Sequence, residues 1–269
     1  MADLAGSGAG PGDVVEPARE DPCMACARLQ RRLGVDAGPE EGAAGRVPLA
    51  LHACCGPCSL VPVRALREQG FEPTIIWANP NIQPVAEHDL RLATLRWWAD
   101  EVAHVRVVEA RCDRDAWERA CAPCGFDRMR RCRACYALRL EEACRVAAEL
   151  GFAYVGTTLA VSPYQLFDEC GAELAARARA HGLEPVWQDF RARYPEATRE
   201  SRELGMYRQG YCGCRFSAAE AAMGRHEARD ARKRAKAAAR AAAGAGTGVA
   251  AGERAVAAGR AAAGPTAAP

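Results

Sequence analysis

The sequence lacks the features of a secreted or membrane protein. Its first 22 residues hold five acidic side chains against one arginine, and they contain no apolar stretch of signal-peptide length. The core of the chain has no run of about 18 uncharged apolar residues, which a membrane span requires. The Gly-x-x-x-x-Gly-Lys-Ser/Thr loop of P-loop nucleotide-binding proteins is also missing. We therefore expect a cytoplasmic protein with no membrane partner.

Cysteine is abundant instead, with 14 among 269 residues. In a reducing cytosol, cysteines at short spacings are more often metal ligands or a redox couple than a structural disulfide framework. We therefore expect the function of the chain to depend on metal or thiol chemistry.

The net charge of +2 is small, but the basic residues are unevenly distributed. Residues 199–240 hold 11 Lys or Arg against 5 Asp or Glu. A second concentration surrounds Cys132, where five arginines face only Asp127: Arg128, Arg130, Arg131, Arg133 and Arg139. Such patches suit a phosphate backbone, although a solvated helix surface has the same composition. We expect the basic residues of segment 225–240 to add nonspecific phosphate contacts.

The middle of the chain predicts an α/β fold. Apolar runs bounded by turn signals predict strands at 47–53, 73–78, 104–109, 153–158 and 184–188. Helical periodicity and end signals predict helices at 59–70, 85–102, 132–150 and 169–181. This alternation is typical of a parallel sheet flanked by helices.

We divide the chain into three parts. Residues 1–46 are expected to form a disordered or loosely ordered extension with one CxxC pair, and residues 47–218 to form the domain. Residues 219–269 form an Ala/Arg-rich tail of low complexity. The tail is expected to be helical at 231–243 and disordered from Gly244 onward, because it lacks the large apolar residues that offset ordering entropy.

Chemically active residue types collect directly after the predicted strands. In parallel α/β sheets, ligands bind beyond the carboxyl ends of the strands. Cysteines and polar residues follow each predicted strand in turn: Cys54, Cys55 and Cys58; Asn79 and Asn81; Cys112 and Asp113; Thr157, Thr158 and Ser162; Asp189 and Arg191. We therefore expect cysteine-bearing loops at one edge of the sheet.

Two groups of cysteines are candidate metal ligands. Cys54, Cys55 and Cys58 lie in a turn, although small buried hydrophobic residues would give the same pattern. Cys132 and Cys135 lie one helical turn apart and open the predicted helix, whose dipole favours thiolates. Together the groups supply enough thiolates for an iron-sulfur cluster or a zinc ion, and their spacing does not choose between these.

The remaining cysteines have more varied interpretations. Cys212 and Cys214 flank one glycine, and a disulfide across such a short loop is strained and easily reduced, which suits a two-electron store. Additional metal ligands are the alternative for this pair. Two further CxxC pairs could form a zinc knuckle: Cys23 and Cys26, and Cys121 and Cys124. Cys144 and Cys170 are expected to be packing residues, and the role of Cys112 stays open.

The segment His52-Ala53-Cys54-Cys55-Gly56-Pro57-Cys58-Ser59 resembles the signature of the cobalamin-independent QueH family of epoxyqueuosine reductases. Later segments are similar to further motifs of this family in the same order: Asn79-Pro80-Asn81-Ile82, Arg131-Cys132 to Cys135-Tyr136, Thr157-Thr158-Leu159, Ser162-Pro163-Tyr164-Gln165, Asp189-Phe190-Arg191, and Tyr207 to Cys214. The resemblance covers about residues 47–217. Cys112, Cys121, Cys124 and the N-terminal CxxC depart from the family pattern.

This resemblance implies a Rossmann-like, mostly parallel sheet and a specific chemistry. It implies a 4Fe-4S cluster held by four cysteines and a redox-active disulfide between Cys212 and Cys214. The implied ligands of the cluster are Cys54, Cys55, Cys132 and Cys135. The implied reaction removes the epoxide oxygen of epoxyqueuosine in the tRNA anticodon loop, giving queuosine and water, with electrons from an unidentified donor.

Several roles are hypotheses within this scheme. Cys58 and Asp113 are candidate ligands of an additional iron that would polarise the epoxide oxygen. Asp189 is a candidate proton donor, and pairing with Arg191 is its alternative role. Three tyrosines are candidates for stacking on the substrate base: Tyr164, Tyr207 and Tyr211.

Two other functions compete with the reductase. A noncatalytic, zinc-dependent RNA-binding module would use the CxxC pairs structurally and the basic segments for binding. A cluster-containing tRNA sulfur-transfer enzyme should carry an ATP pyrophosphate loop, whereas the turn after the first strand is rich in Cys rather than Ser and Gly. Bound metal separates the first two functions, because zinc without sulfide favours the module and iron with sulfide favours the reductase.

Overall fold

A computed structural model describes the backbone of residues 45–261 and the side chains of residues 45–240. The described residues fall into two compact units. The first consists of residues 45–81 and 85–208, and the second of residues 82–84 and 209–261. Cys23 and Cys26, half of the predicted zinc knuckle, lie outside the described residues.

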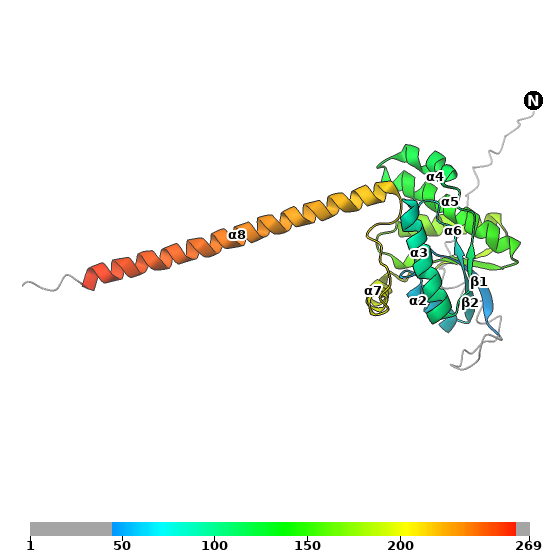
Figure 1. Ribbon diagram of the computed structural model, residues 1–269, viewed down its shortest axis with the longest axis horizontal. Helices are drawn as coiled ribbons and strands as arrows, with labels where there is room; N and C mark the ends of the chain where they lie inside the picture. Colours follow the sequence, from blue (N-terminus) through cyan, green and yellow to red (C-terminus); the bar gives the residue numbers. More distant parts are fainter. Residues whose placement is uncertain (1–44, 262–269) are drawn as a thin grey trace, which may run out of the picture. The chain divides into compact units, whose positions relative to one another are not determined.

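The first unit is built on a five-stranded sheet (Figure 1). Its strands are β1(Val47–His52), β2(Phe71–Trp77), β3(Val107–Glu109), β4(Tyr154–Thr157) and β5(Glu184–Val186). Every pairing is parallel, and the order across the sheet is β3-β2-β1-β4-β5. The predicted parallel α/β fold is confirmed.

Helices precede and follow these strands along the chain. They are α2(Leu60–Glu68), α3(Val85–Trp98), α4(Arg114–Cys121), α5(Arg128–Glu149), α6(Phe167–Ala180) and α7(Tyr194–Glu203). Short turns of other helix types follow α3, α4, β4 and the loop after β5. In this order they are Ala99–Ala103, Ala122–Cys124, Thr158–Val161 and Arg191–Arg193. The sequence did not predict α4 and α7, whose faces carry few large apolar residues.

Strand β2 begins two residues earlier than predicted and contains Pro73 in its interior. Pro73 lies opposite Leu49 of β1, whereas pairing with β3 begins only at Ile75. At Pro73, β2 therefore has a neighbouring strand on one side only. Because proline has no backbone N–H to donate, it is tolerated at such an edge position of a sheet.

The core between the sheet and helices α5 and α6 consists of small and branched side chains. It includes Ala50, Ile76 and Val155 from the strands, Leu140 and Ala143 from α5, and Leu174 and Ala178 from α6. Cys144 and Cys170 belong to this core and are fully buried. Burial also raises the pKa of the Cys144 thiol to about 12. Their predicted role as packing residues is confirmed.

The strand order places a topological switch point beside β1. Strand β1 pairs with β2, the next strand in the chain, on one side and with β4 on the other. The connections on the two sides of this point run in opposite directions, and sheets of this type bind ligands beyond the carboxyl ends of the strands that flank it, here β1 and β4. The cysteine loop after β1 therefore starts at the position where sheets of this type bind ligands.

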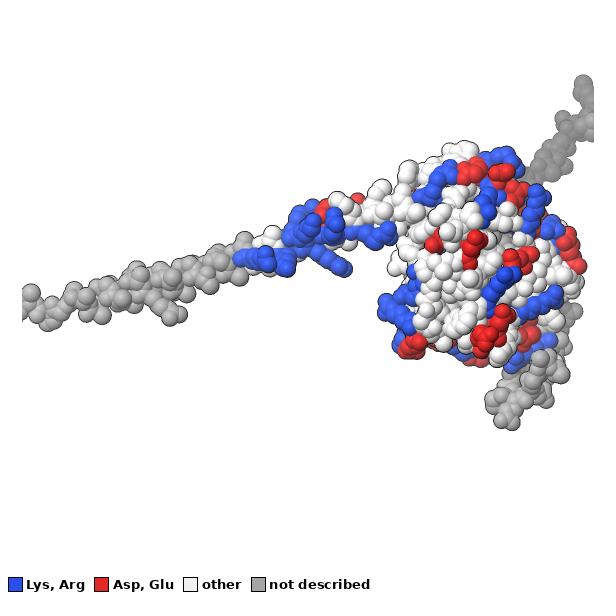
Figure 2. Space-filling model, viewed as in Figure 1, with Lys and Arg blue, Asp and Glu red and all other residues white. Residues whose placement is uncertain are grey.

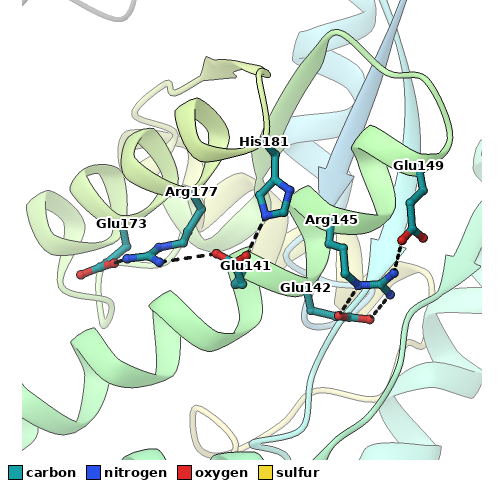
Figure 3. A network of polar contacts seen from close by, with 7 residues as sticks. All are labelled: Glu141, Glu142, Arg145, Glu149, Glu173, Arg177 and His181. Carbon is teal, nitrogen blue, oxygen red and sulfur yellow. Dashed lines mark hydrogen bonds and ion pairs between the residues drawn. The ribbon is translucent and has the colours of Figure 1, made fainter.

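The second half of α5 is held by a network of ion pairs (Figure 3). Glu141 of α5 accepts a hydrogen bond of 2.7 Å from His181, directly after α6, and lies 3.5 Å from Arg177 of α6. One turn further along α5, Arg145 bonds Glu142 at 2.7 Å and Glu149 at 2.5 Å. Such exposed pairs contribute about 0–1 kcal/mol each. Those of Glu141 join α5 to α6 and the residue after it, whereas those of Arg145 lie within α5.

The second unit contains α8(Arg215–Ala261) (Figure 1). The prediction of a helix limited to 231–243 with disorder from Gly244 is wrong, because α8 starts earlier and continues past Gly244. Alanine has the highest helix propensity, and its frequency here offsets the cost of about 1 kcal/mol for each interior glycine. In the part of the chain that is described, no helix is long and apolar enough to cross a membrane.

Candidate metal centre

Three thiols gather in the loop that follows β1. The sulfur atoms of Cys54, Cys55 and Cys58 all lie within 4.8 Å of one another, and those of Cys54 and Cys55 are 4.0 Å apart. Ser59 closes the loop, because its hydroxyl donates to the Cys55 carbonyl at 2.9 Å and its amide to the Gly56 carbonyl at 2.9 Å. Cys54 and Cys55 are buried and Cys58 is half-buried.

The cysteine loop packs closely against its surroundings at Gly56. A Cβ atom at Gly56 would lie 2.5 Å from the Met206 Cε atom and 3.5 Å from the Leu95 Cα atom. A larger residue at this position would therefore require the Met206 side chain to move, whereas its contact with α3 would be an ordinary van der Waals contact.

The three thiols share protons unequally. Hydrogen bonds with Cys55 and Cys58 hold the pKa of the Cys54 thiol well below its usual range, although burial opposes them. Hydrogen bonds with Cys54 and Cys55 raise the pKa of the Cys58 thiol well above its usual range. A metal ion would displace the remaining protons, since thiolates are the form that binds metals.

The second cysteine pair lies inside a helix rather than at its start. Helix α5 begins at Arg128, capped by the Asp127 carboxylate, which accepts the Arg130 amide at 3.1 Å. The prediction that Cys132 and Cys135 open the helix is therefore wrong, and the first-turn dipole argument is weaker for them. Neither cysteine belongs to the tight group of three in the described part of the chain.

Cys135 has a thiol neighbour that the sequence did not reveal. A hydrogen bond with Cys121 of α4 lowers the pKa of Cys135 to about 6, helped by Arg139 and Trp117 and opposed by burial. Cys121 is fully buried, whereas the sulfur of half-buried Cys124 lies 4.0 Å from the Ala120 carbonyl. The two cysteines of this CxxC thus have different surroundings.

A buried arginine connects α5 to the cysteine loop. Arg139, 1% exposed, donates to the Asn79 side-chain oxygen at 2.7 Å, and the Asn79 amide donates to the Ala53 carbonyl at 2.8 Å. The guanidinium charge of Arg139 lowers the pKa of both Cys54 and Cys135. One cation therefore lies near both cysteine groups.

A second buried arginine approaches the loop from α3. Arg91 donates through Nε to Glu87 at 2.8 Å, and the Tyr207 hydroxyl donates to the other oxygen of Glu87 at 2.6 Å. Burial opposes the charge of Arg91, but Glu87 and the thiolates of Cys55 and Cys54 raise the pKa of its guanidinium. The loop thus has permanent positive charge from two helices.

His52 joins the ends of three strands in a neutral form. Its Nε2 lies 3.3 Å from the Ala78 carbonyl, which can only accept, so Nε2 carries the proton. Its Nδ1 then accepts from the Thr157 hydroxyl at 2.9 Å. Burial, followed by the charge of Arg139, lowers the pKa of His52 to about 3.

The structure places Asp113 at a helix start. One of its carboxylate oxygens accepts the Ala116 amide at 2.8 Å, and the other lies 3.3 Å from the Arg111 guanidinium. Within the described residues, Asp113 is not part of the three-thiol group. Burial raises the pKa of the neighbouring Cys112.

Asp189 lies in a bidentate ion pair. Its carboxylate accepts from the Arg191 guanidinium at 2.6 and 2.9 Å and from the Arg191 amide at 2.9 Å. These contacts lower the pKa of Asp189, so the side chain is ionised at neutral pH. Arg191 also lies over the Phe167 ring, 4.0 Å from its centroid. Pairing with Arg191 is the role that the sequence offered as the alternative to proton donation.

Cys212 and Cys214 lie in the second unit, in the turn that leads into α8. Neither thiol forms a disulfide with a described cysteine, and Cys214 is buried whereas Cys212 is half-buried. The Ser217 amide, in the first turn of α8, lies 3.4 Å from the Cys214 sulfur, and the Gln83 amide donates to the Gly213 carbonyl at 2.9 Å. The first turn of α8 therefore contacts the Cys214 thiol directly.

The three tyrosines proposed for base stacking differ in exposure. Tyr164 is 70% exposed and contacts the Tyr194 ring edge-on at 6.0 Å. Tyr207 is bound to Glu87, and the Tyr211 hydroxyl donates to the Gln83 carbonyl. Of these three tyrosines, only Tyr164 is exposed, whereas Tyr207 and Tyr211 are half-buried.

The fold and the thiol group define a parallel α/β protein with a candidate metal centre at the switch point of its sheet. The family described as Epoxyqueuosine reductase QueH matches residues 49–220 of the chain. The chain belongs to this family, as the resemblance of its cysteine motifs predicted.

Named relatives agree with this assignment. The Epoxyqueuosine reductase QueH of Dehalococcoides mccartyi is 32% identical over 169 residues, which cover 63% of this chain and 91% of the relative. The protein of the same name from Thermotoga maritima is 31% identical over 183 residues, covering 63% of this chain and 90% of the relative. The family match ends at residue 220, so most of α8 lies beyond it.

The donor set at the centre fits a soft metal. Three sulfurs within 4.8 Å in a buried loop are the ligands that iron-sulfur clusters and zinc prefer. Two buried guanidinium groups offset the negative charge that such a thiolate site carries. Three thiols leave one coordination position to another ligand, and Cys135 of α5 is a thiol that interacts with Arg139.

Proposed function

We propose that the chain is an iron-sulfur epoxyqueuosine reductase that converts epoxyqueuosine to queuosine in the anticodon loop of tRNA, in the cytoplasm. The observation that carries this proposal is the buried group of Cys54, Cys55 and Cys58 at the switch point of the sheet, in a member of this family. A substrate bound beyond the carboxyl ends of β1 and β4 would meet these thiols first.

The proposed ligands of the 4Fe-4S cluster are Cys54, Cys55, Cys132 and Cys135. Arg139 supports this set, because it acts on the thiols of both groups. Cys58 is the proposed ligand of an additional iron, and its proximity to Cys54 supports a position next to the cluster. Asp113 is the proposed second ligand, through the carboxylate oxygen that does not cap α4. The bound iron would supply an electron path and a Lewis acid for the epoxide oxygen.

The residues of the chain can balance the reaction. Removing the epoxide oxygen breaks two C–O bonds, forms a C=C bond and consumes two electrons and two protons to release water. Oxidation of the Cys212 and Cys214 thiols to a disulfide supplies two electrons and two protons. An external reductant must then return the disulfide to the dithiol for the next cycle.

The substrate base would be recognised in a single-stranded loop. Proteins bind such bases by stacking them on aromatic side chains. Tyr164 is the proposed stacking residue, because its ring is exposed. Asp189 remains a proposed proton donor, but its ion pair with Arg191 keeps it ionised and weakens this role.

The metal content of the protein tests the proposal first. Protein purified without oxygen should contain about four iron and four sulfide ions per chain for the cluster, and one further iron if the second site is filled. Such protein should convert epoxyqueuosine in tRNA to queuosine, which mass spectrometry of the digested nucleosides detects. Zinc without sulfide, even after reconstitution, would contradict the reductase and favour the RNA-binding module.

Replacement of Cys212 tests the electron store. Cys212→Ser should retain the iron and sulfide content but lose multiple turnover with a thiol-reducing donor by about 100-fold or more, equivalent to about 2.7 kcal/mol in the barrier. Cys124→Ser is the matched control, because Cys124 is also half-buried and has no role in the proposed reductase reaction. Full turnover of Cys212→Ser with a chemical reductant would show that the dithiol role is wrong.

A further inference from the structure

The exposed part of α8 carries its positive charge on one side of the helix. Lys and Arg side chains gather along the described part of α8 (Figure 2). Between residues 225 and 240 every basic side chain is exposed. At about 100° per residue, six of the seven basic residues lie within an arc of about 100°. We call these six residues the basic face: Arg225, Arg229, Arg232, Lys233, Lys236 and Arg240.

Acidic residues on α8 lie mainly on the opposite side. Glu220 and Glu227 fall about 170° from the centre of the basic face on the helical wheel. Asp230 lies beyond one border of the face, where it pairs with His226 at 3.2 Å and with Lys233 at 3.9 Å. The segregation of charge therefore does not follow from composition alone.

Most of the basic face has no partner among the residues whose side chains the structure describes. Arg225 lies 3.4 Å from the Gly210 carbonyl, and Lys233 has its long contact with Asp230. Among the residues whose side chains are described, no ion pair or hydrogen bond involves the other four: Arg229, Arg232, Lys236 and Arg240. A row of unpaired like charges repels itself, and an external anion would relieve this repulsion.

We propose that the basic face of α8 binds the phosphate backbone of tRNA. The identification of the RNA rests on the proposed function of the domain. From Arg225 to Arg240 the face is about 22 Å long at 1.5 Å per residue, which is long enough to contact several successive phosphates. Its side chains reach phosphates without reading sequence, so the face raises affinity for tRNA and leaves the choice of base to the domain.

The chemistry of the other side of α8 favours RNA over a membrane surface. Helices that bind membranes in the interface plane bury Trp, Phe or Leu on the side opposite their basic residues. Segment 225–240 contains no Trp, Phe, Leu or other large apolar residue, and alanines, Glu227 and Arg234 occupy that side. The segment also lies beyond the family match, which ends at residue 220, so the face is an addition to the domain shared with the relatives.

Salt-dependent binding tests the proposal on the full chain. The probe is an unmodified tRNA transcript, so the result does not depend on epoxide reduction. In the combined variant Arg229→Gln, Arg232→Gln, Lys236→Gln and Arg240→Gln, the slope of log Kobs against log salt should become less negative by about 3. Affinity at low salt should fall about tenfold or more, while circular dichroism stays helical. An unchanged slope in this variant would overturn the proposal.

A redistributed variant is the matched control for net charge. It adds Ala228→Arg, Ala231→Arg, Ala237→Arg and Ala238→Arg to the four substitutions, which restores the charge but spreads it around the helix. This variant should bind tRNA as weakly as the first one. If the redistributed variant bound tRNA with native affinity, the basic face would not be the binding element. The proposal would also be overturned if vesicles of anionic phosphatidylglycerol bound the native chain more tightly than tRNA does.

The same variants separate this proposal from the proposed function. If epoxyqueuosine tRNA is a substrate, loss of the face should raise KM about tenfold and leave kcat unchanged. An inactive protein that still binds tRNA through the face would contradict the reductase and keep this inference. An active reductase whose affinity for tRNA is unchanged by the four substitutions would support the proposed function and contradict this inference.

Discussion

The two cysteine turns of this chain use the same residue type in opposite settings. The loop after β1 places three thiols within 4.8 Å of one another, under a close contact with Met206 and near two buried arginines. The turn before α8 holds Cys214 by a few local contacts with Ser217 and leaves Cys212 half-buried. A charge-balanced loop with two buried thiols suits a group that must be held, whereas a turn with one half-buried thiol suits a pair that changes its bonding.

The largest expected difference between the two turns is in metal content. Cys55→Ser should lose most of the iron and sulfide of the native protein, because it removes a buried thiolate from the three-thiol group. Cys212→Ser should keep both at the native level, since its turn has no part in holding metal. Metal analysis of the two variants, purified side by side, measures this contrast. Equal loss of iron in both would break the distinction.

The next largest effect concerns the arginine that connects α5 to the loop. Arg139→Gln should destabilise the fold by about 3 kcal/mol, because it leaves the Asn79 oxygen buried without its charged donor. Urea unfolding of the metal-free protein measures this change. Arg133→Gln is the matched control, since Arg133 is exposed on the same helix and should shift stability by less than about 0.5 kcal/mol. On reconstitution with iron and sulfide, the Arg139→Gln variant should also bind less iron than the native protein.

The smallest predicted effect is a pH dependence of stability from His52. Below pH 6.5 the unfolded chain takes up a proton on this residue, whereas the folded imidazole stays neutral down to a pKa of about 3. Stability is therefore lost as pH falls through this window, by about 2 kcal/mol between pH 7 and pH 5. Urea unfolding at the two pH values should show a smaller loss in His52→Gln. An identical loss in both proteins would show that other groups cause it.

The sequence predicted the parts of the fold whose signals are local. The strand before Cys54, the turn at Gly56 and the alternation of strands and helices all depend on neighbouring residues, and all are present. The predicted start of α5 was wrong by four residues. The prediction began the helix at the cysteine motif, whereas the Asp127 side chain caps a helix that begins at Arg128. The contact between Cys121 and Cys135 depends on the packing of α4 against α5, which no local pattern encodes.

The positions of Arg91 and Arg139 in the sequence could have predicted that both arginines are buried and paired. His88, Arg91, Leu92 and Leu95 follow one face of α3, and all four are buried. Arg139 occurs between leucines in a similar stretch of α5, where Leu140 is buried. A charged residue on the apolar face of a predicted helix indicates a buried partner, which here is Glu87 for Arg91 and Asn79 for Arg139.

Helix α5 connects events at its two ends. Its 22 residues carry Cys132, Cys135 and Arg139 in one half and the ion pairs of Glu141 to Glu149 in the other. Segments of this kind open to solvent as cooperative units, so protection at one end depends on interactions at the other. Metal bound at the cysteines should therefore slow amide hydrogen exchange near Glu149, far from any ligand, and this distant end of α5 would report whether the centre is loaded.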